Sequence, residues 1–155
     1  MSNVMIRRAE LEELPRIACL KKQIHDVHVN GRPDLFTPYT CLEAFADDSA
    51  AKGCTLLLAE TAGEPVGYVM YRFVHRPSSP YMKERDFVHV EEFCVDENHQ
   101  RMGIGRGLME ELKRQAREAG CPRIELDVWG FNEGAKQFYE AAGLKAYRTF
   151  MEMEI

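Results

Sequence analysis

The sequence predicts an α/β fold, in which one domain is built on a mixed sheet flanked by helices. The spacing of the apolar residues changes along the chain between the three- and four-residue steps of a helix and the alternation of a strand. No repeat, low-complexity tract or linker-like stretch interrupts this succession. The length of 155 residues, with 45% hydrophobic and 29% charged side chains, is typical of one globular domain. We therefore expect residues 1–155 to form a single domain with the element order β-α-α-β-β-β-α-β-α-β.

The first part of the chain is predicted to form one strand and two helices. Met5–Ala9 has the composition of a short strand. Two prolines within residues 32–38 predict a loop, and a second helix carries Leu42 and Phe45. The first helix, which ends near Asn30 and Gly31, is indicated by apolar residues at helical spacing: Leu14, Ile17, Leu20, Ile24 and Val27.

Three strands and a long helix are expected next. Thr55–Thr61 and Val66–Phe73 are apolar, β-branched or aromatic runs joined by a hairpin turn over residues 62–65, and Phe87–Val95 is the third strand. Gly120, followed by Pro122, supplies the end of the helix. The apolar face of that helix is formed by Leu108, Met109, Leu112, Ala116 and Ala119.

The last part of the chain is predicted to form a strand, a short helix and a final strand. Residues 123–128 alternate as a strand. The helix has its apolar stripe within residues 135–142 and ends at Gly143. Tyr147–Ile155 is expected to close the sheet as the final strand.

Composition excludes several classes of protein. A net charge of −5 argues against a nucleic-acid-binding protein, because such proteins usually present a basic face. No signal-peptide core and no run of about 18 apolar residues occurs, so we expect a cytoplasmic protein without a membrane partner. Five widely spaced cysteines without a C-x-x-C pair predict reduced thiols. His25 and His28 have no partner at a ligand-like spacing, so no metal site is predicted.

Residues 100–107, with the sequence Gln-Arg-Met-Gly-Ile-Gly-Arg-Gly, carry the strongest local signal. They lie between a predicted strand and a predicted helix, where unpaired amides and the helix dipole favour a phosphate. Arg101 and Arg106 add positive charge, which predicts an anionic ligand. A P-loop would need Lys-Ser/Thr after Gly105, and a dinucleotide fingerprint would need glycine at Leu108, so neither motif is present.

This segment matches the Gln/Arg-x-x-Gly-x-Gly/Ala signature of the GNAT acetyltransferases at Gln100, Gly103 and Gly105. The resemblance extends from about Phe87 to Phe150 and includes residues 90–95 and 132–144. It implies a central, mostly antiparallel sheet with two splayed strands, and acetyl-CoA as co-substrate. The cofactor-binding residues that the resemblance implies are Phe93, Val95, Gln100, Arg101, Gly103, Ile104, Gly105, Arg106, Gly107 and Asn132.

Three side chains are candidates for catalysis. An amine must lose its proton before it attacks a thioester, and the resemblance places the acidic pair Glu91 and Glu92 where a base is needed. Because neighbouring strand residues face opposite sides, we expect only one of the two to reach the acceptor; the resemblance favours Glu91, and His89 stays an alternative. By resemblance, Tyr139 protonates or hydrogen-bonds the departing thiolate.

The sequence therefore predicts an N-acetyltransferase that moves an acetyl group from acetyl-CoA to a primary amine, by direct attack in a ternary complex. The expected acceptor is a small molecule such as a polyamine, an amino sugar or an amino-acid derivative, and we expect residues 32–39 to help select it. Two alternatives stay open: a peptide or protein amine acetyltransferase, and a non-catalytic acyl-CoA-binding regulatory module. Association into a homodimer also stays open.

Overall fold

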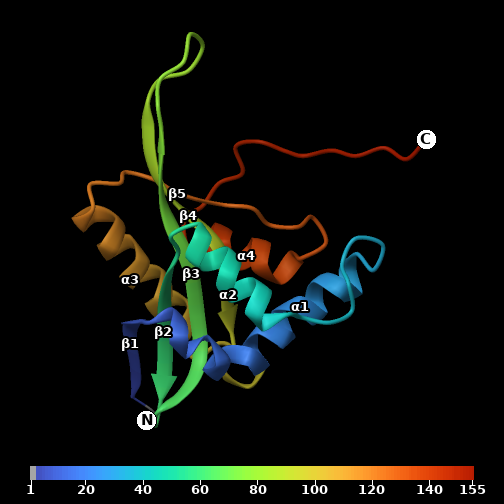
Figure 1. Cartoon of the computed structure of the whole chain (residues 1–155), viewed down its shortest axis with the longest axis vertical. Helices are drawn as coiled ribbons and strands as arrows, with labels where there is room; N and C mark the ends of the chain where they lie inside the picture. The colour runs from blue at the N-terminus through green and yellow to red at the C-terminus, as the bar shows by residue number, and fades with distance from the viewer. Residues whose placement is uncertain (1–2) are drawn as a thin grey trace.

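The computed structural model describes residues 3–155, which form a five-stranded mixed sheet with helices on both faces (Figure 1). The strands lie in the order β1-β2-β3-β4-β5; the first four pair antiparallel and β5 pairs parallel to β4. The strands are β1 (Val4–Ala9), β2 (Thr55–Thr61), β3 (Glu64–Arg76), β4 (Arg85–Val95) and β5 (Ile124–Leu126). The α-helices are α1 (Ala18–Gly31), α2 (Leu42–Ala51), α3 (Ile104–Glu118) and α4 (Glu133–Ala141).

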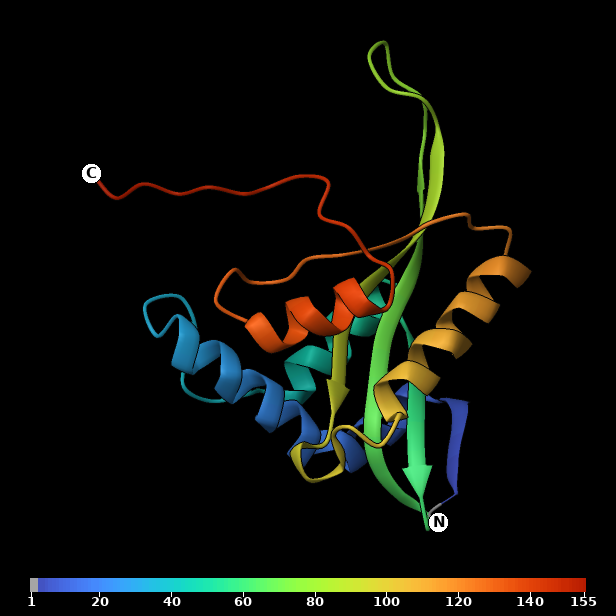
Figure 2. The same cartoon turned by 180° about the vertical axis from the view of Figure 1, so that it is seen from behind.

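Alternation along the central strands creates two hydrophobic cores, one on each face of the sheet. Leu56 and Leu58 of β2 face α1 and α2, whereas Leu57 and Ala59 face α3. The same alternation in β3 sends Tyr68 to the first core and Tyr71 to the second. Both cores contain fully buried side chains, and Figure 2 shows α3 and α4 together on the second face. The sheet thus separates the two cores, and any site between α1 and α4 is built on the sheet.

The predicted first helix is divided in two. Leu11–Ile17 forms a 3-10 helix and α1 begins only at Ala18. Pro15 lies inside the first segment and lacks the N–H that a continuous α-helix would use, which accounts for the tighter turn. Leu14 and Ile17 are nevertheless buried, as their spacing predicts.

The predicted final strand is not formed. Residues 145–155 have no strand pairing within residues 3–155, and the chain there runs away from the sheet (Figures 1 and 2). A strand needs a neighbour for its amides and carbonyls, and the edge of β5 is not occupied by this segment. The observed order of strands and α-helices therefore ends with α4.

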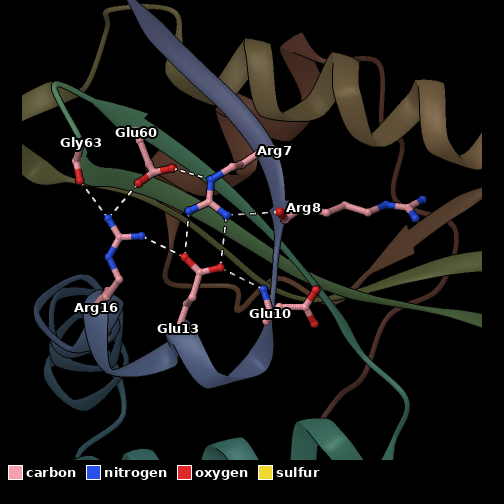
Figure 3. A network of polar contacts seen from close by, with 7 residues as sticks. All are labelled: Arg7, Arg8, Glu10, Glu13, Arg16, Glu60 and Gly63. Atoms are coloured by element: carbon pink, nitrogen blue, oxygen red, sulfur yellow. Dashed lines mark hydrogen bonds and ion pairs between the residues drawn. The ribbon is translucent and has the colours of Figure 1, made fainter.

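An ion-pair network fastens β1, the 3-10 helix and β2 together (Figure 3). The guanidinium of Arg7 binds Glu13 at 2.7 Å and Glu60 at 2.7 Å, and Arg16 binds the same two carboxylates at 3.0 and 2.8 Å. Hydrogen bonding from Arg7 holds the pKa of Glu13 at about 2, below its usual 4.5. Hydrogen bonding from Arg16 likewise lowers the pKa of Glu60.

We expect this network to make folding stability sensitive to acid. Because the folded-state pKa of Glu13 lies below the unfolded value, its stabilisation is complete above about pH 4.5 and is lost as the pH falls toward about 2. Thermal melts of the wild type and Glu13→Gln should therefore differ most near neutral pH and converge in acid. Glu12→Gln removes an exposed neighbouring carboxylate as the control. A constant difference between wild type and Glu13→Gln across pH 6 to pH 2 would contradict this assignment.

Within the described residues, no helix is both long enough and apolar enough to cross a membrane.

Candidate active site

A β-bulge in β4 places the acidic pair. The register pairs Met70 with Glu92 and Tyr71 with Val90, so Glu91 is an extra residue without a partner on β3. Val90 and Phe93 both pack on the core beneath α3. The two glutamates between them consequently reach the opposite face, covered by α1 and α2. Strict alternation, which would have separated Glu91 from Glu92, does not hold here.

The two carboxylates have different partners on that face. Glu91 binds Arg72 of β3 at 2.7 Å and lies 3.6 Å from Lys52 at the end of α2. Glu92 accepts a hydrogen bond from the hydroxyl of Tyr68 at 2.5 Å and forms an ion pair with Lys21 of α1. The Lys21–Glu92 pair is largely buried, with side chains 13% and 16% exposed. Glu92 therefore joins α1 to the sheet, a function that no local sequence pattern indicates.

The strands β4 and β5 separate after a short paired stretch. They pair only from Val88 with Ile124 to Val90 with Leu126, after which β5 ends and β4 continues to Val95. On the side toward β5, the main chain of residues 91–95 has no strand partner among residues 3–155. This is the splay that the family resemblance implies, and it includes Phe93 and Val95. Unpaired amides and carbonyls there can bind an extended ligand arm.

The glycine-rich turn lies directly after this part of β4. Gly103 is the N-cap of α3 with φ of +81°, and Arg101 has φ of +63°, so two residues use left-handed backbone to turn the chain. The first helical hydrogen bond joins the amide of Gly107 to the carbonyl of Gly103, which leaves the amides of residues 104–106 without partners inside the helix. A Cβ at Gly103 would meet nothing within 4 Å. The turn is therefore open to an anion.

The other two glycines of the turn allow close packing. A Cβ at Gly105 would lie 2.9 Å from the ring of Phe138 in α4, and one at Gly107 would lie 3.0 Å from Ile6 in β1. A side chain at either position would require its neighbour to shift, because α3 approaches the surrounding elements closely. The exposed side chains of Gln100, Arg101 and Arg106 surround the turn, and Ile104 is buried beneath it.

Tyr139 and Asn132 enter the site from α4. The ring of Tyr139 packs edge-on against Phe93 with centroids 6.1 Å apart. Burial raises the pKa of Tyr139 to about 12, so its hydroxyl stays protonated at neutral pH. No hydrogen-bond acceptor for that hydroxyl is found in the described part of the chain. Asn132 caps α4 by accepting from the amide of Ala135 at 3.2 Å, which leaves its NH₂ group available.

These elements enclose a small cleft of about 70 Å³ between α1, β4, the chain after β5, and α4. The cleft brings together Glu91, Glu92, Phe93, Asn132 and Tyr139, whereas Val95 and the glycine turn are not part of its lining. His28 lines it as well. Burial lowers the pKa of His28, so the imidazole is neutral at pH 7.

An aromatic cluster lies at the cleft, and two of its members, His28 and Trp129, line it. His28 stacks on Phe36 with centroids 5.1 Å apart, Phe36 meets Trp129 edge-on at 5.3 Å, and Trp129 stacks on Phe131 at 6.1 Å. Trp129 thus lines the cleft in addition to packing. The cluster links the loop after α1 to the chain after β5, which lie far apart in the sequence. His89 lies outside the cleft lining, 3.9 Å from Glu91.

Comparison with known proteins agrees with this architecture. Residues 20–144 match the profile described as the Acetyltransferase (GNAT) family. The chain belongs to the GNAT acetyltransferase family. Its sheet, flanking helices and splayed central strands are the acetyltransferase fold, and membership makes the chain an acetyltransferase enzyme. Enzymes of this family use acetyl-CoA as co-substrate.

Individual relatives cover different amounts of this GNAT chain. The glucosamine 6-phosphate N-acetyltransferase of Trypanosoma brucei brucei is 30% identical over 67 residues, which cover 43% of this chain and 44% of the relative. The probable N-acetyltransferase Rv2775 of Mycobacterium tuberculosis is 24% identical over 90% of this chain and 78% of its own length. A solved structure of a mutant BH1408 protein from Bacillus halodurans has a TM-score of 0.89 with 30% identity, covering 97% and 99% of the two chains. Aminoglycoside N-acetyltransferase AAC(6')-Iy, solved with CoA, has a TM-score of 0.76 at 16% identity over 100% of this chain and 96% of that one.

We expect Gly103→Ala to weaken acetyl-CoA binding about tenfold, because the new methyl group would occupy the open side of the turn. Gly120→Ala is the matched control at the other end of α3: Gly120 also has a left-handed φ, +72°, and free space around it. Both variants should lose similar thermal stability through backbone strain. Calorimetric titration with acetyl-CoA should separate them. Equal affinities for acetyl-CoA would place the pyrophosphate elsewhere.

Proposed function

We propose that this chain transfers the acetyl group of acetyl-CoA to the primary amine of a small molecule, by direct attack in a ternary complex. The observation that carries the proposal is the separation of β4 from β5 beyond Val90 and Leu126. It leaves the main chain of residues 91–95 free beside the open turn at Gly103. Tyr139 reaches the opening from α4, and the acidic pair reaches it from the other face of the sheet.

Binding of the co-substrate is assigned to main-chain groups. The amides of residues 104–106 and the positive end of the α3 dipole would hold the pyrophosphate, with Arg101 and Arg106 adding charge. The free edge of β4 at Phe93 and Val95 would hold the pantetheine arm, and the NH₂ group of Asn132 would add a hydrogen bond. The thioester carbonyl then lies at the splay, within reach of an amine in the cleft.

The chemical step requires a neutral amine. An ordinary alkylamine has a pKa near 10.4, so deprotonation at pH 7 costs about 4.6 kcal/mol. Glu91 accepts the proton, directly or through a water molecule, while the nitrogen forms its bond to the thioester carbon. The carbon–sulfur bond then breaks, the nitrogen loses a second proton to water, and Tyr139 donates a hydrogen bond, or its hydroxyl proton, which water then restores, to the departing thiolate.

Direct attack is favoured over an acetyl-cysteine intermediate by the state of Cys94 on β4. Its thiol is buried and donates to the carbonyl of Leu20 at 3.4 Å, and burial raises its pKa to about 12. A nucleophilic cysteine needs the thiolate form, which this environment disfavours.

The size and charge of the cleft support a small cationic acceptor. About 70 Å³ accommodates the reacting end of a small amine, and the carboxylate of Asp127 lines the space beside Glu91 and Glu92, whose carboxylates bind Arg72 and Lys21. The ring of Trp129, which lines the cleft, can contact the carbon skeleton of the acceptor. The trypanosomal relative is named for an amino-sugar phosphate, which supports including amino sugars among the candidates.

The test is steady-state release of CoA from acetyl-CoA with a panel of polyamines, amino sugars, amino-acid derivatives and short peptides, with mass spectrometry of the products. We expect N-acetylation of at least one small amine at a kcat/KM well above that of any peptide. Preference for a peptide amine would overturn the small-molecule assignment. Tight acetyl-CoA binding without turnover on any acceptor would favour a regulatory module.

A further inference from the structure

The first turns of α1 are bonded to alternate residues at the end of β4. The contacts at Glu92 and Cys94 hold the strand itself. A third contact lies just beyond the strand, where Gln23 of α1 meets Asp96 and Glu97, and Figure 2 shows the chain after β4 passing beside the start of α1. Among residues 3–155, those that line the cleft do not include Gln23. Its function therefore lies elsewhere.

The side-chain amide of Gln23 makes two hydrogen bonds to consecutive residues. Its Nε2 donates to Oδ1 of Asp96 at 2.8 Å, and its Oε1 accepts from the main-chain amide of Glu97 at 3.0 Å. A carboxamide carries a donor and an acceptor side by side, so a single side chain satisfies both partners. The two bonds together define where the chain leaves β4 and in which direction it continues.

Asp96 extends this contact toward the glycine-rich turn. Its second oxygen, Oδ2, binds Nδ1 of His99 at 2.5 Å, and His99 directly precedes Gln100, the first residue of the turn. The Asp96 side chain is 15% exposed, and hydrogen bonding from Gln23 and then His99 lowers the pKa of Asp96, so the carboxylate is charged at neutral pH. The position of Gln23 is thus passed to the start of the turn through one carboxylate.

The glycine-rich turn depends on contacts at its two ends. Residues 100–103 are exposed, and Arg101 and Gly103 both have left-handed backbone. The far end is held by Ile104, which is buried at the start of α3. An exposed turn that presents several amides to one anion loses conformational entropy on binding unless it is ordered beforehand. Order at its first end therefore depends on the contact with α1.

We propose that Gln23 is a positioning residue for acetyl-CoA, which orders the glycine-rich turn from α1 without touching the ligand. It acts by holding Asp96 and Glu97 in place. The inference rests on the proposed function in one respect, the binding of acetyl-CoA at the turn, and does not depend on the acceptor or the catalytic residues. The helix α1 then serves both substrates, because its Ile24 and His28 line the cleft.

The first test is calorimetric titration with acetyl-CoA, well below the melting temperature of each variant. Gln23→Leu keeps the size of the side chain, removes both hydrogen bonds and should weaken binding about tenfold. Gln137→Leu makes the same change at an exposed glutamine of α4 and should bind like the wild type. Cys94→Ala removes another contact of α1 with β4 and should lower the melting temperature but not the affinity. Wild-type affinity in Gln23→Leu, or an equal loss in Cys94→Ala, would overturn the proposal.

The second test exchanges donor and acceptor. Gln23→Glu sets two carboxylates against each other and should weaken acetyl-CoA binding more than Gln23→Leu does. In Gln23→Glu/Asp96→Asn, the introduced amide donates to the introduced carboxylate, which still accepts from the main-chain amide of Glu97, and the asparagine oxygen accepts from His99. The double variant should regain most of the affinity that Gln23→Glu loses. A double variant as weak as Gln23→Glu would show that this pairing does not order the turn.

Amide hydrogen exchange, measured by NMR without ligand, reads the contact directly. The amide of Glu97 should exchange faster in Gln23→Leu than in the wild type, because it has lost its acceptor. Unchanged exchange at Glu97 would contradict the inference even if the affinity for acetyl-CoA fell. A wild type that binds no acetyl-CoA would overturn the proposed function together with this inference, whereas equal binding by the wild type and Gln23→Leu would overturn this inference alone.

Discussion

Tyr139→Phe is expected to lower turnover about 100-fold while leaving acetyl-CoA affinity nearly unchanged, since it removes the one hydroxyl that reaches the splay from α4. The ring keeps its packing against Phe93 and Phe138, so the melting temperature should change little. Tyr81→Phe, at a side chain 95% exposed, is the control for loss of a hydroxyl. Steady-state kinetics and calorimetry make the comparison.

The raised pKa of Tyr139 sharpens this prediction. With a value of about 12, the phenol stays protonated throughout the usual assay range, so its loss should lower turnover by a similar factor from pH 6 to pH 10. A fall in wild-type turnover at alkaline pH would then be due to the titration of another group. Full activity in Tyr139→Phe would show that Tyr139 contributes only its packing contacts.

Substituting the acidic pair should separate a base from a structural ion pair. Glu91→Gln should lower turnover about 10- to 100-fold at pH 7, and the deficit should shrink as alkaline pH supplies neutral amine. The fold should survive, because the partner guanidinium of Arg72 is 27% exposed and can be hydrated. Assays from pH 6 to pH 10 on one acceptor measure the trend. An equal loss at every pH would transfer the base assignment to Glu92 or His89.

Glu92→Gln is the matched comparison, with the same change one residue along the strand. It leaves the ammonium of Lys21, 13% exposed, without its carboxylate and should cost about 1–3 kcal/mol of stability. We therefore expect its main effect in thermal melts. If Glu92→Gln kept the wild-type melting temperature and lost turnover in a pH-dependent way, Glu92 would be the base and Glu91 the structural ion-pair partner.

Local patterns were sufficient to predict most of the framework. Thr55–Thr61 matches β2 because apolar runs between turn residues need only a nearby hairpin partner. The turn at Gly103 and the cap at Gly143, with φ of +100°, were predictable because only glycine adopts such backbone easily. The splay of β4 and β5 came from family resemblance, because strand separation leaves no periodic signal.

The errors in the sequence-based prediction share a physical cause. The bulge at Glu91 depends on how β4 aligns with β3, and alternation along one strand cannot reveal an extra residue. The expected strand at residues 147–155 has a strand's composition, but pairing depends on a neighbour that the chain does not place there. The ion pair of Lys21 with Glu92 joins residues 71 positions apart, beyond any local pattern.

The bulge also suggests how a second carboxylate can arise in evolution. Val90 and Phe93 face the α3 side whether or not Glu91 is present, because a strand without this residue would alternate normally through Val90, Glu92 and Phe93. Insertion of a single codon is then enough to add an acid beside Glu92, and the core side chains of β4 keep facing the same side of the sheet. By the same reasoning, deletion of that codon would leave a regular strand, an intact fold and one acid fewer at the cleft.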